Sequence, residues 1–413
     1  MSSLALFLLQ IAVIVLVTGL CGVLLGKLGQ PRVVGEMLGG ILLGRSVFGY
    51  AAPHLISQLF PPTSLHTLSL VSELGMVLYL FLEGMNLDFA SVWQQRHTAL
   101  KISVASMAIP FVLGCGLGLL LYRNFHGTGG NKVAFMIFLG VSLSTTAFPV
   151  LARMLRDQST GDTKLNTLAL VCAAIADVMG WMLLAVALMI NTVGVSPWML
   201  VFKMFLLVLF GAFLLGVVRP ILGKLVRWKG APNISQLLLA TFLVFILGCA
   251  FVTERLGVHA LFGAFLAGMC IPRLHHWHRQ LYRTIHPLVS VLLLPVFFAM
   301  TGIHTEFRDL GGKSVLLWFV VLLVLAIAGK VGGTYYAARK SDLPKQESLL
   351  LGFLMNTRGL VDLVVVNLAF QAGAINTQLF TILVLVALIT TAMTAPSLNL
   401  LKKNPEVPTP AAA

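Results

Sequence analysis

The sequence predicts an all-α polytopic membrane protein, and two features of its composition carry that prediction. Of its 413 residues, 58% are hydrophobic and only 10% are charged, whereas soluble proteins are about 25% charged. Apolar runs recur along the chain, and most are near the roughly 20 residues with which a helix crosses a bilayer. The alternating apolar and polar strands that build membrane β-barrels are absent from the sequence.

Thirteen membrane spans are expected, separated by short polar loops. They lie at residues 4–27, 32–50, 67–86, 99–122, 133–156, 164–191, 197–218, 233–254, 257–272, 284–303, 314–338, 346–371 and 376–400. An odd number of spans places the two termini on opposite sides. Basic residues gather in cytoplasmic loops, and most of the 28 Lys and Arg residues fall on the side that holds the C-terminus. We therefore expect a multi-pass protein of the plasma or inner membrane, with its N-terminus outside and its C-terminus cytoplasmic.

A single transmembrane domain accounts for nearly the whole chain. Residues 1–401 form this domain, and residues 402–413, rich in Pro and Ala, are expected to form a disordered cytoplasmic tail. The formal net charge of +14 indicates contact with anionic lipid in the bilayer. Nucleic-acid binding is not expected, because no basic stretch is interleaved with exposed aromatic residues.

The sequence lacks the motifs of enzymes and of cofactor sites. It contains no HExxH zinc motif and no GxSxG nucleophile motif. Its 5 cysteines do not have the spacing of metal ligands. We therefore expect neither an enzyme nor a bound cofactor.

Two of the spans contain residues that interrupt a helix. In the first, Pro149 cannot donate a backbone hydrogen bond and disfavours helical geometry at the preceding residue. The polar residues Ser144, Thr145 and Thr146 stand just before it.

The second interrupted span is "LLGFLMNTRGLVDLVVVNLAF", residues 350–370, with the polar cluster Asn356, Thr357, Arg358 and Gly359 at its middle. Irregular backbone at membrane depth occurs only where protein or a water-filled cavity surrounds it. Transporters use such broken helices to bind ions at the midplane. Because the two breaks lie in corresponding halves of the chain, they also suggest an inverted repeat.

One carboxylate, Asp177, lies near the centre of the apolar run "LALVCAAIADVMGWMLLAVALMI" at residues 168–190. An ionised carboxylate at that depth costs at least about 2.5–3.5 kcal/mol. Binding either a proton or a monovalent cation removes part of that cost, so Asp177 has two states of low energy. Such a group couples cation movement to proton movement. The alternative is that Asp177 only pairs with a basic residue and fixes helix packing.

Three further charged residues in predicted spans, Lys330, Arg358 and Asp362, bear on the site. Lys330 is the leading partner for Asp177, either competing with a bound cation or forming a constant ion pair. Arg358 and Asp362 are spaced i, i+4 on one helix and are expected to pair. We expect that pair to have a structural and electrostatic role beside the second break.

Five ordered stretches resemble the monovalent cation:proton antiporter-2 family. They are "QPRVVGEMLGGILLGRSVFG" (30–49), "STTAFPVLARML" (144–155), "GVHALFGAFLAGMCIP" (257–272), "PVFFAMTGIHTEF" (295–307) and "NTRGLVDL" (356–363). The resemblance implies about thirteen helices in two inverted repeats with broken crossing helices, a sodium/proton antiporter-like fold. It also implies a homodimer, with interleaved dimerisation and mobile core subdomains, and elevator-type alternating access.

The resemblance also implies roles for individual residues. Asp177 matches the membrane carboxylate that binds cation or proton, and Thr145 and Thr146 match the unwound segment beside it. Lys330 matches a basic residue of the eleventh span, and the second crossing segment is matched by Asn356 and Arg358.

Ala176 departs from this pattern, because the family usually has Asn or Asp before the binding aspartate. With a single carboxylate at that place, electroneutral exchange of one proton per cation is the simplest expectation.

The leading hypothesis is a secondary antiporter that exchanges Na⁺ or K⁺ for H⁺, for which pH homeostasis is one fitting role. A sodium-coupled symporter of a small organic solute on a related fold is the alternative, and it requires more polar groups at the midplane than the sequence shows. A passive channel requires a continuous polar pore, whereas the midplane charges here are few. The motifs do not separate Na⁺ from K⁺.

Overall fold

The computed structural model describes residues 2–86, 96–157, 163–191, 197–229, 235–272, 275–307 and 312–403. These residues form helices joined by short connections, with one isolated β-bridge between His126 and Ile375. Within the expected tail at 402–413, Lys402 and Lys403 complete the last helix, and the remainder lies outside the described residues.

Nine helices in the described part of the chain are long and apolar enough to cross a membrane, or ten if one bent pair counts as a single span. The nine are Ser3–Lys27, Pro62–Asn86, His97–Phe125, Lys164–Asn191, Val201–Lys224, Gln236–Arg255, Trp277–His304, Lys313–Lys340 and Thr377–Leu398. The all-helical membrane fold is thereby confirmed. The count of thirteen is not, because the expected spans 32–50, 133–156 and 257–272 contain shorter or interrupted helices.

The chain divides into two compact units, each assembled from three separate stretches. The first unit comprises Met1–Cys21, Glu36–Leu87 and Ala185–Glu306. The second comprises Gly22–Gly35, Asp88–Leu184 and Phe307–Ala413. Helices α1 (Ser3–Lys27) and α10 (Thr163–Asn191) run from one unit into the other.

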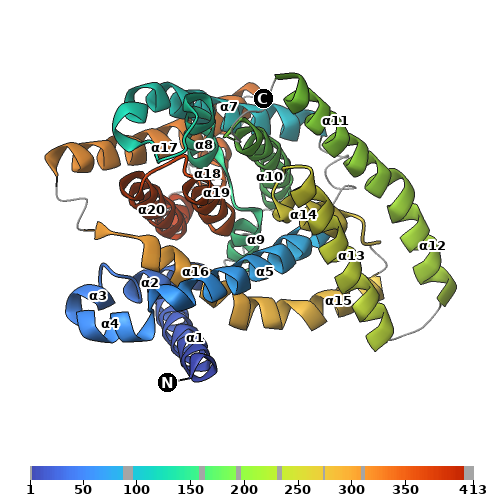
Figure 1. The fold of residues 1–413 in the computed structure, drawn as a ribbon. Coiled ribbons are helices and arrows are strands. Elements are labelled where there is room, and N and C mark those ends of the chain that lie inside the picture. Colours follow the sequence, from blue (N-terminus) through green and yellow to red (C-terminus); the bar gives the residue numbers. More distant parts are fainter. Residues whose placement is uncertain are drawn as a thin grey trace, which may run out of the picture. The chain divides into compact units, whose positions relative to one another are not determined.

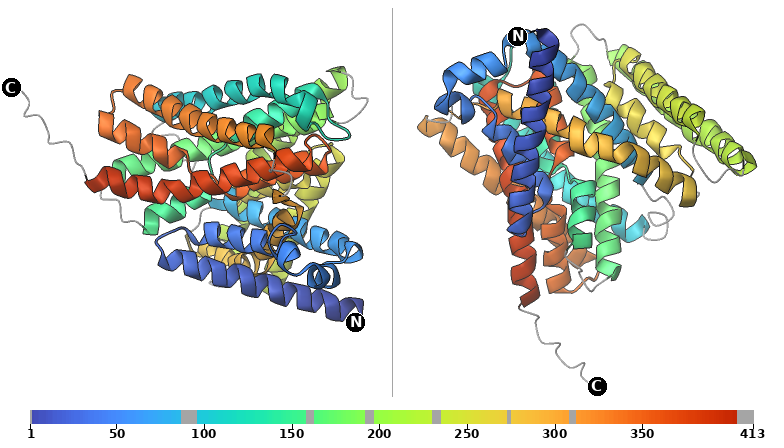
Figure 2. Two further views of the ribbon diagram at one scale, coloured as in Figure 1. Left: turned by 90° about the vertical axis from the view of Figure 1, so that its left-hand side faces the viewer. Right: turned by 90° about the horizontal axis from the view of Figure 1, so that it is seen from below.

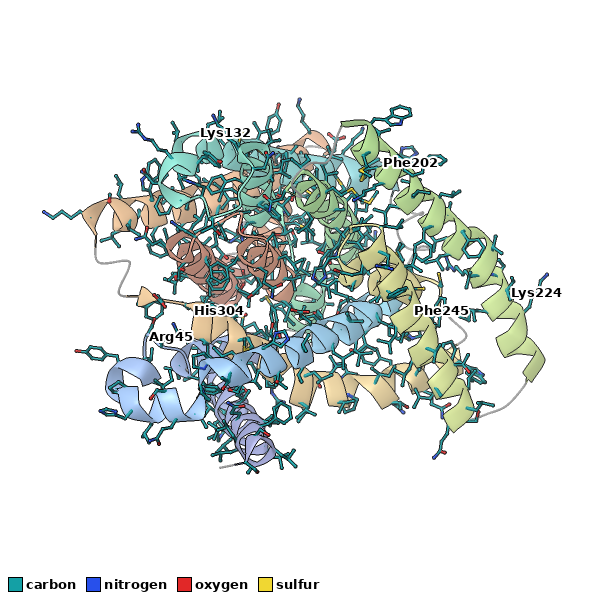
Figure 3. All side chains as sticks on the ribbon, viewed as in Figure 1. Arg45, Lys132, Phe202, Lys224, Phe245 and His304 are labelled. Carbon is teal, nitrogen blue, oxygen red and sulfur yellow. The ribbon has the colours of Figure 1, made fainter. Side chains whose placement is uncertain are left out.

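The first unit contains α1 and the helices α2 (Arg32–Leu42), α3 (Phe48–Ala51), α4 (Pro53–Leu59), α5 (Pro62–Asn86), α11 (Pro197–Phe213), α12 (Arg219–Lys229), α13 (Gln236–Arg255), α14 (Ala260–Met269), α15 (His275–Leu288) and α16 (Leu294–His304). Short π-helical turns join α11 to α12 and α15 to α16, at Leu214–Val218 and Val289–Leu293. At one end of this unit Arg45 pairs with Glu306 at 3.6 Å, and Figure 3 shows Arg45 close to His304.

Glycines allow helices of the first unit to pack backbone against backbone. A Cβ atom at Gly268 of α14 would meet the Phe81 carbonyl oxygen and lie 2.9 Å from the Met85 nitrogen of α5. Gly40 of α2 and Gly302 of α16 approach one another in the same way. Small residues give membrane helices this close contact, since lipid supplies no hydrophobic force between them.

The exposed side of the first unit follows α11 and α12. In the apolar, membrane-spanning stretch of Val201–Lys224, only 11% of the residues are buried. Phe202 is 53% exposed there, and Figure 3 shows Phe202 and Lys224 toward opposite ends of this pair of helices. Continuous apolar exposure of this extent is expected to face lipid.

The second unit repeats one order of elements. A long helix, a broken pair and another long helix appear first as α7 (Arg96–Phe125), α8 (Lys132–Ser144) with α9 (Phe148–Asp157), and α10. They appear again as α17 (Lys313–Lys340), α18 (Lys345–Met355) with α19 (Leu360–Gln371), and α20 (Thr377–Lys403). α17 packs on α7 and α20, beside which it runs in Figure 2. This matched order supports the expected repeat.

Backbone hydrogen bonds tie the loop before α8 to the loop after α19. The Gly127 and Gly129 amides donate to the carbonyls of Ala374 and Gly373, at 3.1 and 3.2 Å. The Asn376 amide donates to the Phe125 carbonyl at 3.0 Å. The entry to one broken pair is therefore fixed to the exit of the other.

Replacing Gly268 by alanine is expected to destabilise the protein by about 1–3 kcal/mol, because the new methyl group overlaps the α5 backbone. The measurement is the apparent melting temperature of purified protein in detergent. Gly248→Ala on α13 is the matched control, since a Cβ atom there meets nothing within 4 Å. Equal melting temperatures for the two variants would contradict the close contact of α5 with α14.

Candidate functional site

The first break separates α8 from α9 at residues 145–147. α8 ends at Ser144, and Thr145 adopts an extended backbone with φ −63° and ψ 152°. The expected break is present, but it precedes Phe148, which already belongs to α9. Pro149 is tolerated in the first turn of α9, because amides at that position have no partner within the helix.

The second break separates α18 from α19 at residues 356–359, and the two helices bend by 43° across it. The two breaks hydrogen-bond directly to each other. The Ala147 amide donates to the Thr357 carbonyl, and the Thr146 hydroxyl donates to the Met355 carbonyl, both at 2.9 Å. Irregular backbone deep in the protein is thereby satisfied, as its burial requires.

A close approach at Gly359 makes this crossing possible. A Cβ atom there would lie 2.5 Å from Cγ2 of Val150 and 3.2 Å from Cβ of Ala147. Because any larger residue would push the two breaks apart, glycine is required at this point of the "NTRG" cluster.

Two cationic side chains cover the C-terminal carbonyls of α8. Arg358 donates from Nη1 to the Ser142 carbonyl and from Nη2 to the Leu143 carbonyl, the latter at 2.5 Å. Lys330 donates from Nζ to the Ser144 carbonyl. The last carbonyls of a helix lack partners within it and carry partial negative charge. The two cations therefore satisfy the helix end at the break.

Lys330 was expected to pair with Asp177, which stays a prediction, and the structure shows in addition that its Nζ donates to the Ser144 carbonyl. Its ammonium group is fully buried. The charge of that group interacts with the carboxylates of Asp362 and Asp177. Lys330 thus links the helix end at the first break with both buried acids electrostatically.

Asp177 lies on α10 and is 5% exposed. Ser103 of α7 donates to the Cys172 carbonyl at 3.1 Å and holds α10 against α7. A Cβ atom at Gly180, one turn beyond Asp177, would lie 3.1 Å from Cγ2 of Thr145. The segment of α10 that carries the carboxylate therefore passes the first break.

The three hydroxyls of the first break each donate to backbone. Ser144 and Thr145 donate to the Val141 carbonyl at 3.1 and 3.2 Å, and Thr146 donates across to Met355. A hydroxyl that donates its hydrogen keeps acceptor lone pairs on its oxygen. These oxygens therefore suit a monovalent cation.

Arg358 and Asp362 form an ion pair with 3.6 Å between Nη1 and Oδ2, as their spacing predicts. Asp362 lies in the first turn of α19. Upstream, both polar atoms of the Asn356 side chain and the Thr357 hydroxyl are buried without a hydrogen-bond partner among the described residues. The second break therefore presents polar groups that the described protein does not satisfy.

The sequence analysis missed Thr391 of α20. Its hydroxyl lies 2.8 Å from the Arg358 carbonyl and 2.7 Å from the Ala387 carbonyl, so it bridges α20 to the second break. The available signal was the cluster of three threonines, Thr390, Thr391 and Thr394, in an otherwise apolar span, and all three are buried.

Replacing Arg358 by lysine is expected to lower the free energy of unfolding by about 1–3 kcal/mol. A lysine keeps the positive charge, but it lacks the planar guanidinium group that donates to two carbonyls at once. The melting temperature in detergent reports this loss. Arg339→Lys is the control, since Arg339 is exposed and donates to one carbonyl only. An Arg358→Lys protein as stable as this control would contradict the capping role.

The sequence was compared with known families and proteins. The family model described as "Sodium/hydrogen exchanger, transmembrane" matches residues 12–401. Cation/H(+) antiporter 17 of Arabidopsis thaliana is 39% identical over 396 residues, which cover 95% of this chain and 48% of that protein. The K(+)/H(+) antiporter 1 of Saccharomyces cerevisiae is 31% identical, with 96% and 46% covered. The chain thus spans about half the length of these two relatives.

Other matches cover nearly the whole of both chains. The Na(+)/H(+) antiporter NhaS4 of Synechocystis sp. is 36% identical over 403 residues, which cover 96% of this chain and 97% of that protein. The solved sodium proton antiporter MjNhaP1 of Methanocaldococcus jannaschii aligns with a TM-score of 0.62 at 12% identity, covering 96% and 99% of the two chains. The structural likeness shows a shared fold, and the resemblance seen in the motifs is confirmed. The chain belongs to the family of transmembrane sodium/hydrogen exchangers.

Proposed function

We propose that this protein exchanges a monovalent cation, Na⁺ or K⁺, for protons across a membrane, with Asp177 as the cation-binding carboxylate. The observation that carries the proposal is a buried acid on α10, whose helix passes the first of two crossed helix breaks. The relatives are named for Na⁺, K⁺ or unspecified cations in exchange for protons. We infer for this chain the activity that these names share, which is exchange of a cation for protons.

Ligands for the cation come from the first break. The carbonyls of Ser142, Leu143 and Ser144 already accept hydrogen bonds from Arg358 and Lys330. Pro149 stands four residues after Thr145 and has no N–H with which to close a helical bond to the Thr145 carbonyl. That carbonyl, the break hydroxyls and the Asp177 carboxylate form an all-oxygen set of the kind that binds alkali cations.

Alternation between cation and proton follows from burial. A carboxylate at membrane depth is costly when it is bare, and a bound cation or a proton relieves that cost. Ala176 adds no second acid at this place, so we propose electroneutral exchange of one proton for one cation. Lys330 and Arg358 then stay charged and hold the break in shape.

The transport movement is proposed to follow an elevator scheme, in which one unit carries the ion across the membrane. All the site residues described above lie in the second unit, which supports its role as the carrier. By the family resemblance we assign the first unit to a homodimer interface. The distribution of basic residues supports a plasma or inner membrane location, with the N-terminus outside and the C-terminus in the cytoplasm.

Replacing Asp177 by asparagine is expected to reduce cation-driven proton movement to the background of empty liposomes, because the amide binds neither a proton nor a cation at neutral pH. The measurement uses purified protein in liposomes that contain a pH dye, with NaCl, KCl or choline chloride added outside. Asp342→Asn is the matched control, because Asp342 is exposed in the loop after α17. A fully active and folded Asp177→Asn protein would refute the proposed role.

Clamping the membrane voltage in the same liposomes tests the stoichiometry. Because one cation replaces one proton, the rate of proton movement is expected to stay unchanged when the clamp is applied. A rate that depends strongly on voltage would show that more than one proton moves per cation. If neither Na⁺ nor K⁺ drives proton movement, the result would favour the symporter hypothesis.

A further inference from the structure

Asp362 is the second deeply buried acid of the second unit, and its burial is not compensated by hydrogen bonds. Its side chain is 2% exposed. Neither Oδ1 nor Oδ2 has a hydrogen-bond partner among the residues that the structure describes. A buried carboxylate in a structural ion pair normally takes direct and often paired hydrogen bonds from its arginine.

Arg358 does not supply those bonds, because its two terminal nitrogens are directed to backbone carbonyls. Nη1 and Nη2 donate to the carbonyls of Ser142 and Leu143. The 3.6 Å between Nη1 and Oδ2 of Asp362 exceeds the roughly 2.7–3.2 Å of an N–H···O hydrogen bond. The guanidinium group therefore offers Asp362 its charge, but no hydrogen bond.

The charged groups that face Asp362 are few. Arg358 precedes it on the chain, and Lys330 of α17 also acts on it electrostatically. The helices that pack most closely against α19 are α20 and α8, and the charged residues of these two helices stand only at their ends, at Lys132, Lys402 and Lys403. Burial favours the neutral acid, whereas the two cations favour the anion. These opposing influences act on a carboxylate that has no hydrogen-bond partner among the described residues, which makes Asp362 a candidate for proton uptake.

We propose that Asp362 carries the exchanged proton, while Asp177 carries the cation. This inference rests on the proposed function and separates the two ions onto different carboxylates. In the cation-loaded state, both acids are ionised and the cation sits at Asp177. In the proton-loaded state, Asp177 is ionised and neutralised by Lys330, and Asp362 holds the proton on one carboxyl oxygen.

The two states carry the same net charge, so exchange remains one for one. The first contains the cation, Lys330, Arg358 and two carboxylates. The second contains Lys330, Arg358, one carboxylate and one neutral acid. One positive charge enters as a cation when one leaves as a proton.

Lys330 couples the two acids, because its charge acts on both of them. When a cation neutralises Asp177, the ammonium group is left to stabilise the anion of Asp362, and the proton departs. When the cation leaves, Lys330 is drawn to neutralise Asp177, and Asp362 takes up a proton. No contact between the cation and Asp362 is required.

The test compares two assays on the full chain in liposomes. The first measures proton movement driven by NaCl or KCl. The second measures uptake of radioactive sodium or rubidium against the same unlabelled cation at equal pH, which requires the cation site alone. For Asp362→Asn we expect proton movement to fall by about tenfold or more, because the amide cannot take up a proton, while isotope exchange persists. Asp177→Asn should lose both activities, and Asp342→Asn should keep both.

Two results for a folded Asp362→Asn protein would overturn the proposal. Undiminished proton movement would place the proton elsewhere, and loss of both activities would make Asp362 part of the cation site or its frame. If this variant does not fold, Asp362→Glu keeps a titratable carboxyl group and should retain both activities with a shifted pH dependence. An unshifted profile would contradict the inference. Wild-type protein that moves no protons in response to Na⁺ or K⁺ would instead refute the proposed function.

Discussion

The capping of one helix end by two buried cations is the interaction on which the site depends. α8 stops in the protein interior, where its last carbonyls lack partners within the helix. Arg358 and Lys330 supply the missing donors, so the chain can leave α8 in extended form. That extended segment is what lets Thr146 and Ala147 bond to the second break and brings Thr145 beside α10.

Fixed positive charge at this place also sets the electrostatics of the acids. Arg358 stays ionised under all ordinary conditions, and its Nη1 and Nη2 atoms donate to backbone carbonyls. It therefore acts as a permanent charge that cannot follow a moving ion. In the exchange proposed above, the two carboxylates respond to cation and proton, and the charge of Lys330 acts on both. The capped end of α8 and the two buried acids, Asp177 and Asp362, all belong to the second unit.

Much of this could be predicted from the sequence, for reasons that are local. Asp177, Arg358 and Asp362 stood out because charge is costly in apolar spans, and Pro149 marked the span that contains the first break. The hydrogen bond from Lys330 to the Ser144 carbonyl could not be predicted, because a backbone acceptor 186 residues away leaves no pattern in composition. Thr391 escaped notice because buried threonines in membrane helices usually bond to their own helix. The count of spans was uncertain where glycine-rich helices are too short to satisfy a length rule.

The long-range nature of the cap has a consequence for biogenesis. The donors that satisfy α8 lie 186 and 216 residues later in the chain, so they emerge from the ribosome long after α8 has entered the membrane. During that interval the end of α8 must rely on water, lipid headgroups or insertion factors. The first half of the repeat therefore cannot complete its hydrogen bonds until α17 and the second break have been synthesised.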